Sequence, residues 1–147
     1  MTRLVLAGST IAIAAATAWL SATAPYRAAL GAYTTDLAAR TPDQRINIVE
    51  ASGRLDGAEI DPGATFSFNA RVGPRTEPRG FVAAPAYLEG LRHASVGGGI
   101  CQVSSTAYNA ALVAGLPIHQ RVAHDRLVRS VAPGADATVW YGKADLA

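Results

Sequence analysis

One stretch of the sequence organises the expected fold: Gly97-Gly98-Gly99-Ile100-Cys101-Gln102-Val103-Ser104, which carries the only cysteine of the chain. The three glycines allow the backbone to approach a ligand closely, because no side chain stands in the way. The following residues, Gln102 to Ala114, predict a buried helix that ends at Gly115. A thiol in the first turn lies at the positive end of the helix dipole, which favours the thiolate. The stretch therefore predicts a nucleophile; the alternative is a packed thiol, since free cysteine is often buried.

Three further elements are predicted before the glycines. Phe81 to Leu88 and Leu91 to Val96 are typical of two strands, joined at Glu89-Gly90 by a hairpin turn. Upstream, Thr41-Pro42-Asp43-Gln44 begins a helix, with threonine as N-cap and proline at the first position. We expect this helix to end near Asp56, and its apolar stripe to consist of Ile48, Ala51, Ser52 and Leu55.

The remaining segments alternate between loops and short strands. Thr65 to Phe68 alternates as a half-buried strand does, whereas Val72 to Gly80 has too much proline and glycine for regular structure. Two more strands are expected near Ile118 to Ala123 and Ala137 to Tyr141, separated by a turn at Pro133-Gly134. The sequence thus predicts a single α+β domain, in which an antiparallel sheet packs on the Cys101 helix and the Thr41 helix.

The N-terminus is typical of an export signal. Arg3 precedes an uncharged run from Leu4 to Leu20, and Ala22-Thr23-Ala24 is a signal-peptidase site. The alternative is a retained anchor, because the run is almost long enough to span a bilayer. We therefore divide the chain into a signal peptide or N-terminal anchor over residues 1–24, a linker over residues 25–40 that could contain a short helix, and a domain over residues 41–147.

Composition limits the function classes. Thirteen Lys and Arg against eleven Asp and Glu give a net charge of +2, without a basic tract, so nucleic-acid binding has no support. The histidines lack the paired spacing of zinc ligands, and we expect neither metal nor cofactor. An exported chain with one cysteine has no internal disulfide, so Cys101 pairs with another chain, stays inert or does chemistry. Contact with a membrane is expected only through the N-terminal segment, if it is not cleaved.

A cysteine nucleophile needs a base, and the base needs a group that orients it. We choose His124 as the base and Asp136 as the orienting group, following the order of papain-like enzymes. A hydrogen-bonded structural histidine and a turn-capping aspartate are the alternatives for these two positions. His93 is a second candidate base, because it lies just before the glycines, and His119 is expected at the surface.

Substrate contacts are expected around the start of the Cys101 helix. Backbone N–H groups there would hold an oxyanion, with Gly98 and Gly99 close to the ligand. Gln102 is a further donor, although a helix-start hydrogen bond explains it equally well. Three arginines are candidates for a substrate carboxylate, with ordinary ion pairs as the alternative: Arg75, Arg79 and Arg121.

The chain resembles the VanW family from about Tyr33 to Leu146. The resemblance rests on Asp61-Pro62-Gly63, Phe66-Ser67-Phe68-Asn69, Val72-Gly73-Pro74-Arg75-Thr76, the glycine-cysteine stretch, Tyr108-Asn109-Ala110, Ala114-Gly115-Leu116, Arg121 with His124, Asp136-Ala137-Thr138-Val139 and Tyr141-Gly142. The chain departs from the family pattern at Asp125, where family members often have serine. The family is named after an accessory protein of vancomycin-resistance clusters, and some members are peptidoglycan L,D-transpeptidases with a catalytic cysteine.

The resemblance implies that Cys101 is the nucleophile and His124 the family's histidine. The implied reaction attacks the amide after the third residue of a stem peptide, releases D-alanine and passes the acyl group to an amine. We therefore expect an exported cell-envelope acyl transferase whose partners are peptidoglycan stem peptides. The alternatives are a non-catalytic module that binds such peptides and a structural partner in a resistance complex.

Overall fold

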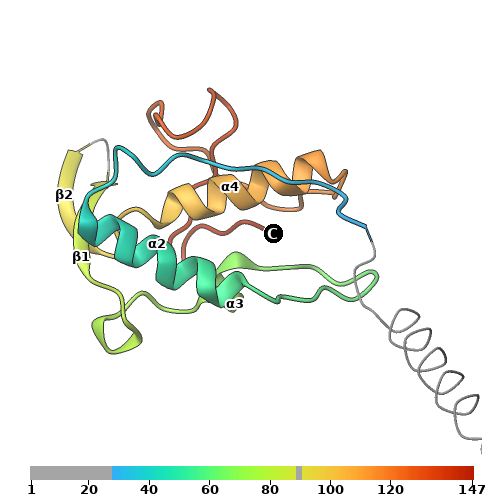
Figure 1. Ribbon diagram of the computed structural model, residues 1–147, viewed down its shortest axis with the longest axis horizontal. Helices are drawn as coiled ribbons and strands as arrows, with labels where there is room; N and C mark the ends of the chain where they lie inside the picture. The colour runs from blue at the N-terminus through green and yellow to red at the C-terminus, as the bar shows by residue number, and fades with distance from the viewer. Residues whose placement is uncertain (1–27, 89–90) are drawn as a thin grey trace, which may run out of the picture.

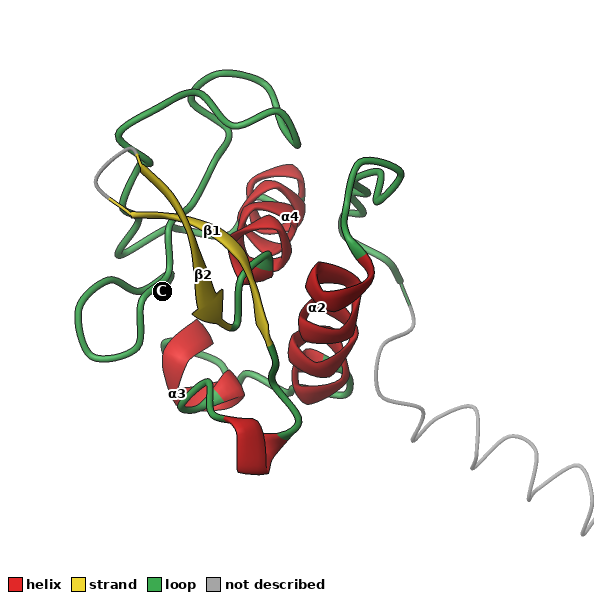
Figure 2. Ribbon diagram, turned by 90° about the vertical axis from the view of Figure 1, so that its left-hand side faces the viewer, coloured by secondary structure: helices red, strands yellow, loops and turns green. Residues whose placement is uncertain are grey.

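The computed structural model describes residues 28–88 and 91–147. Within these residues, three helices and one hairpin follow each other: α2 (Pro42–Leu55), α3 (Phe68–Val72), a 3-10 turn (Glu77–Arg79), β1 (Ala83–Leu88), β2 (Leu91–Val96) and α4 (Ile100–Val113). Figure 2 shows the hairpin beside α2 and α4. The predicted α+β class is confirmed. The predicted signal of residues 1–24 and the turn at Glu89-Gly90 lie outside the described residues.

Helix α2 begins and ends where its sequence predicts. The Thr41 side chain accepts from the Gln44 N–H, and the Gln44 side chain accepts from the Thr41 N–H, so both form a capping box. Asp56 is the C-cap. Ile48 and Ala51 are buried as expected, whereas Ser52 is exposed. Polar Asn47 is fully buried in its place, because its amide binds the backbone of other segments.

The hairpin leads directly into the cysteine helix. Strands β1 and β2 pair antiparallel from Ala83 opposite Val96 to Leu88 opposite Leu91, as predicted. The glycines then turn the chain into α4, and Gly99 is the N-cap with a φ of 101°. A Cβ on Gly98 would lie 2.4 Å from the carbonyl oxygen of Ala84. At this position glycine is therefore needed for packing of the chain against β1.

Three predicted elements are wrong. The predicted strand at Thr65 to Phe68 is instead an irregular segment that leads into α3, because the Ser67 side chain caps that helix by accepting from the Ala70 N–H. The strands predicted near Ile118 to Ala123 and Ala137 to Tyr141 do not form: these segments make only isolated bridges. Backbone groups of the second segment bind side chains of α4 instead of a neighbouring strand.

The segment before α2 contains no helix within residues 28–40, where the short helix was considered, and makes a turn at residues 38–39. It runs along α4 (Figure 1), where the Thr35 and Thr106 hydroxyls lie 2.8 Å apart. A Cβ on Gly31 would lie 2.7 Å from the Ala114 nitrogen, which demonstrates the close approach of the two segments. The Gln102 amide nitrogen also donates to the Asp36 carbonyl at 2.9 Å.

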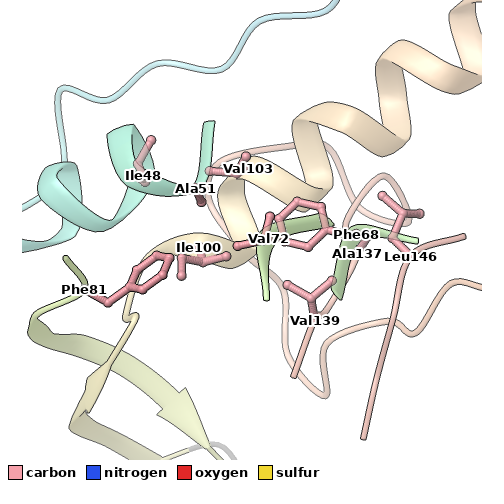
Figure 3. Packing of buried hydrophobic residues seen from close by; sticks show 10 residues of the cluster. All are labelled: Ile48, Ala51, Phe68, Val72, Phe81, Ile100, Val103, Ala137, Val139 and Leu146. Atoms are coloured by element: carbon pink, nitrogen blue, oxygen red, sulfur yellow. The ribbon is translucent and has the colours of Figure 1, made fainter. Parts of the chain in front are cut away.

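The hydrophobic core joins every helix to the C-terminal segment. Figure 3 shows its ten buried side chains, contributed by α2, α3, the segment just before β1, α4 and residues 137–146: Ile48, Ala51, Phe68, Val72, Phe81, Ile100, Val103, Ala137, Val139 and Leu146. Each full burial of a large apolar side chain stabilises the fold by about 1.5–3 kcal/mol. The core thus fixes the C-terminal segment against the start of α4, where Cys101 lies.

Candidate active site

Cys101 lies in the first turn of α4 and is partly buried. Its Sγ is 3.7 Å from the carbonyl oxygen of Val139, on the C-terminal segment. The N–H groups of Ile100 and Gln102 donate to Gly97 and Gly99. Among the described residues, the Cys101 N–H has no hydrogen-bond acceptor. It is therefore available to a ligand beside the thiol.

One face of α4 holds the C-terminal segment in place. Ser104 Oγ donates to the Ala137 carbonyl at 2.7 Å, and Ser105 Oγ accepts from the Ala137 N–H at 3.0 Å. One turn further, Asn109 Nδ2 donates to the Ala135 carbonyl at 2.6 Å. These side chains fall on the same helix face as Cys101, since they follow it by three, four and eight residues. The bonds place Asp136 close to the thiol.

Asp136 binds both His124 and Arg121. Its Oδ2 lies 2.7 Å from His124 Nδ1 and accepts from the His124 backbone N–H at 2.7 Å. Its Oδ1 accepts from Arg121 at 2.9 Å, and Arg121 also donates to the Asp136 and Gly134 carbonyls. The Arg121 guanidinium lies 5.4 Å from the ring centroid of Tyr108, on α4. The carboxylate is thus held on both sides.

The His124 side chain lies close enough to Cys101 for the thiol to act on its pKa, and it binds Asp136. Burial acts to lower the pKa of His124, but the interactions with Cys101 and Asp136 outweigh it, and the pKa lies above the ordinary value of 6.5. Burial acts to raise the pKa of Asp136, but hydrogen bonds from His124 outweigh it, and the pKa lies below 3.8. These shifts favour an ionised Asp136 and strengthen His124 as a proton acceptor beside the thiol.

A hollow opens next to this cluster. It has a volume of about 340 Å³ and is lined by residues of the loop from Arg121 to Asp136, including His124 and Arg126. In Figure 1 this loop, orange to red, rises above α4. Another hollow of about 350 Å³, lined by residues between Glu59 and Arg71, contains none of the three reactive side chains. His124 and Asp136 line the first hollow, whereas Cys101 lines neither hollow.

Several predicted site residues lie elsewhere or are already bound. The Gln102 side chain is 4% exposed and binds Arg40, Thr35 and Asp36 on the N-terminal segment, so it does not join the cluster. Gly98 packs against β1, and a Cβ on Gly99 would lie 3.1 Å from Gln44. Both glycines therefore contact the chain itself.

The other basic residues considered for the site take different positions. His93 lies on β2 opposite Ala86, and His119 is exposed and donates its N–H to the Ala147 carbonyl. Arg79 donates to the Val72 carbonyl at 3.0 Å. Arg75 lies close enough to Cys101 for electrostatic interaction, and its guanidinium is buried. Of the three histidines, the structure brings His124 to the thiol.

The polar face of α4 has a structural role that our sequence reasoning did not assign. None of Ser104, Ser105 and Asn109 was predicted as a site residue. Their spacing from Cys101 in an uninterrupted helix is the signal that would have placed them on the thiol's face. Which segment they bind is a tertiary property, because the partners are 26 to 33 residues away.

Two further properties of the described residues concern metal binding and membrane spanning. Within residues 28–88 and 91–147 there is no group of three or more His, Cys, Asp or Glu side chains able to hold a metal ion. In the same ranges, none of the helices has the length and apolar character needed to cross a membrane.

Comparison with known proteins identifies relatives of the chain. A family model described as "VanW like protein" matches residues 43–147. The uncharacterized protein YoaR of Bacillus subtilis (strain 168) is 48% identical over 99 residues, which are 67% of this chain and 33% of that protein. The chain therefore spans about a third of the length of this relative. No solved structure matches the chain.

Proposed function

The chain belongs to the VanW family, and from this premise we propose that it is an exported, cysteine-dependent acyl transferase of the L,D-transpeptidase type, acting on peptidoglycan stem peptides. The observation that carries the proposal is the chain of contacts from Arg121 through Asp136 and His124 to Cys101. This is the arrangement that activates a thiol nucleophile: a base beside the thiol and an anion that orients the base. The apolar N-terminal run supports delivery to the cell envelope.

Each residue of the cluster has a defined part in the reaction. His124 takes the proton of Cys101 Sγ, and the thiolate attacks the carbonyl carbon of the amide after the third, diamino-acid residue of the stem. The tetrahedral oxyanion accepts a hydrogen bond from the unpartnered Cys101 N–H. When the intermediate collapses, the C–N bond breaks and His124 returns its proton to the departing D-alanine amine, which leaves a thioester on Cys101.

The second half of the reaction reverses these roles. An acceptor amine attacks the thioester carbon, and His124 removes the proton that the amine loses. The C–S bond then breaks, and the proton passes to Cys101, which regenerates the thiol. Asp136 stays ionised throughout and keeps the His124 ring oriented, because its lowered pKa disfavours proton uptake.

The proposal is tested by intact-protein mass spectrometry of the purified protein mixed with a tetrapeptide stem. We expect an adduct on Cys101 whose mass equals the tetrapeptide minus D-alanine, with free D-alanine in solution. The Cys101→Ala variant should give neither product. Binding of the tetrapeptide without an adduct or D-alanine release, together with slow alkylation of the thiol, would overturn the enzyme proposal and favour a non-catalytic binding module.

A further inference from the structure

Arg75, an arginine close to Cys101, has two buried terminal nitrogens without a hydrogen-bond partner among the described residues. Arg75 lies on the loop after α3, and a Cβ on Gly97 would lie 2.9 Å from its Cβ and Cγ. Its guanidinium carbon is 5.7 Å from the ring centroids of both Phe68 and Tyr141. Contacts with two aromatic rings hold the plane of the guanidinium in place. The terminal N–H groups therefore point in fixed directions.

Those terminal groups have no hydrogen-bond partner among the described residues. Arg75 Nη1 and Nη2 are both buried and unbonded. Leaving a charged donor without a partner in the protein interior is costly, and arginine does not relieve the cost by losing its proton. Burial acts to lower the pKa of Arg75, while Cys101, Asp145 and Tyr141 act to raise it, and the net direction is downward. The Arg75 guanidinium is thus a desolvated cation without a hydrogen-bonded anion among the described residues.

The nearby groups limit what that anion is. Both nitrogens are shielded from solvent, so the counter-ion comes from inside the site and not from a dissolved carboxylate. Asp145 is already engaged: its oxygens accept from Ser67 Oγ at 2.5 Å, the Asn69 N–H at 2.8 Å and the Leu146 N–H at 2.9 Å. Cys101 is the neighbour that gains a negative charge during the proposed reaction.

We propose that Arg75 is a positioning residue whose guanidinium is a second counter-ion of the Cys101 thiolate, in addition to His124. This inference rests on the proposed function, in which the proton of Cys101 Sγ moves to His124 and leaves a thiolate. The thiolate then faces an imidazolium oriented by Asp136 on one side and the guanidinium of Arg75 on the other. Asp145 and Tyr141 are the other ionisable groups that interact with Arg75.

The test is the pH profile of Cys101 alkylation by iodoacetamide in the full chain, which needs no stem peptide. Arg75→Gln should move the midpoint of the profile up by about one pH unit and slow alkylation about tenfold below that midpoint. Arg75→Lys should stay close to the wild type, because it keeps the charge while losing the same ring contacts. Arg129→Gln removes an exposed positive charge and serves as the matched control.

Two results would overturn the inference. One is an Arg75→Gln profile identical to that of the wild type. The other is an equal shift in Arg75→Lys and Arg75→Gln, which would assign the effect to packing. If Arg75→Gln does not fold, as shown by circular dichroism, a nuclear magnetic resonance titration of Arg75 Nε decides. In the wild type, the Arg75 Nε chemical shift should change at the pH midpoint of the Cys101 thiol. In Cys101→Ser this change should be absent. If it persists in Cys101→Ser, the inference is overturned.

The two proposals fail independently. An alkylation profile that depends on the Arg75 charge, without an adduct from the tetrapeptide, would support the counter-ion and reject the stem-peptide substrate. A tetrapeptide adduct with an alkylation profile that ignores Arg75 would support the proposed function and reject the counter-ion.

Discussion

A single oxygen of Asp136, Oδ2, lies 2.7 Å from both the backbone nitrogen and the ring Nδ1 of His124. The first bond fixes the chain at His124 and the second fixes its ring, so the proton on Nδ1 faces the carboxylate. The same geometry is built with residues 12 positions apart in the sequence, on a segment without regular strands.

Removing the charge of Asp136 should disable the histidine. In Asp136→Asn, the amide side chain presents a donor to Nδ1 and favours the wrong tautomer of His124. We expect acylation of Cys101 by the tetrapeptide to slow about 100-fold or more, measured by time-resolved intact-protein mass spectrometry. Asp125→Asn, at the exposed neighbour of His124, is the control and should retain the wild-type rate. Equal rates in the two variants would contradict the role of Asp136.

Arg121 should act through Asp136. Its guanidinium makes three hydrogen bonds, to the Asp136 carboxylate and to the Asp136 and Gly134 carbonyls. Arg121→Met should lower the free energy of unfolding by about 1–3 kcal/mol, because it leaves these partly buried acceptors without a donor. Urea denaturation measures this loss, and acylation should slow as well. Arg126→Met, on the same loop but exposed, should change stability by less than about 0.5 kcal/mol.

The charged pair predicts a pH dependence of stability. The pKa of His124 is raised above 6.5 by its bonds, after they outweigh burial, so its contribution is complete below pH 6.5 and is lost as the pH rises through the folded value. The pKa of Asp136 is lowered below 3.8, so its contribution is present above 3.8 and is lost as the pH falls through the folded value. The excess stability of the wild type over His124→Gln should therefore shrink with rising pH.

Urea denaturation of both proteins between about pH 5 and about pH 9 measures that difference. A difference that stays constant across the range would contradict the raised pKa of His124. The matching comparison of wild type with Asp136→Asn, extended to lower pH, should keep its difference above pH 3.8 and lose it only as the pH falls below that value.

Asn47 should be a large contributor to stability although it is polar. Its side chain is fully buried, donates to the carbonyls of Val82 and Gly98, and accepts from the Val82 N–H. Asn47→Ala leaves these groups buried without partners, so we expect a loss of about 2–4 kcal/mol in the free energy of unfolding. Val49→Ala, at a 68% exposed position of the same helix, is the control and should cost less than about 0.5 kcal/mol.

Two glycine substitutions should have opposite effects. A Cβ at Gly98 meets the Ala84 carbonyl at 2.4 Å, so Gly98→Ala should cost about 1–3 kcal/mol by displacing the turn from β1. At Gly53, inside α2, nothing lies within 4 Å, and Gly53→Ala should stabilise the protein by about 0.5–1 kcal/mol. Thermal denaturation compares the two. An unchanged melting temperature in Gly98→Ala would show that the turn tolerates a side chain.

Local signals in the sequence were enough for most of the regular structure. The capping box at Thr41, the alternation on either side of Glu89-Gly90 and the apolar run after Cys101 each act within a few residues, so α2, the hairpin strands and α4 were predicted close to their observed bounds. Family membership was also readable, because the glycine-cysteine motif is specific, and the family match over residues 43–147 confirms it. The candidate catalytic residues Cys101, His124 and Asp136 were chosen from the chemistry of their side chains and their order in the sequence.

Only the tertiary structure decided how the segment after α4 is held. Its backbone groups bind Ser104, Ser105 and Asn109 across 26 to 33 residues, which is why the alternating pattern near Ala137 forms no strand. The same bonds bring Asp136 and His124 to Cys101, and the ring stack at Arg75 leaves its nitrogens facing inward without a partner. Such contacts depend on which distant segments pack together, and the spacing of residues along the sequence does not predict that packing. The sequence alone determined the two long helices α2 and α4 and singled out the candidate nucleophile, whereas long-range hydrogen bonds to α4 determined which charged side chains surround it.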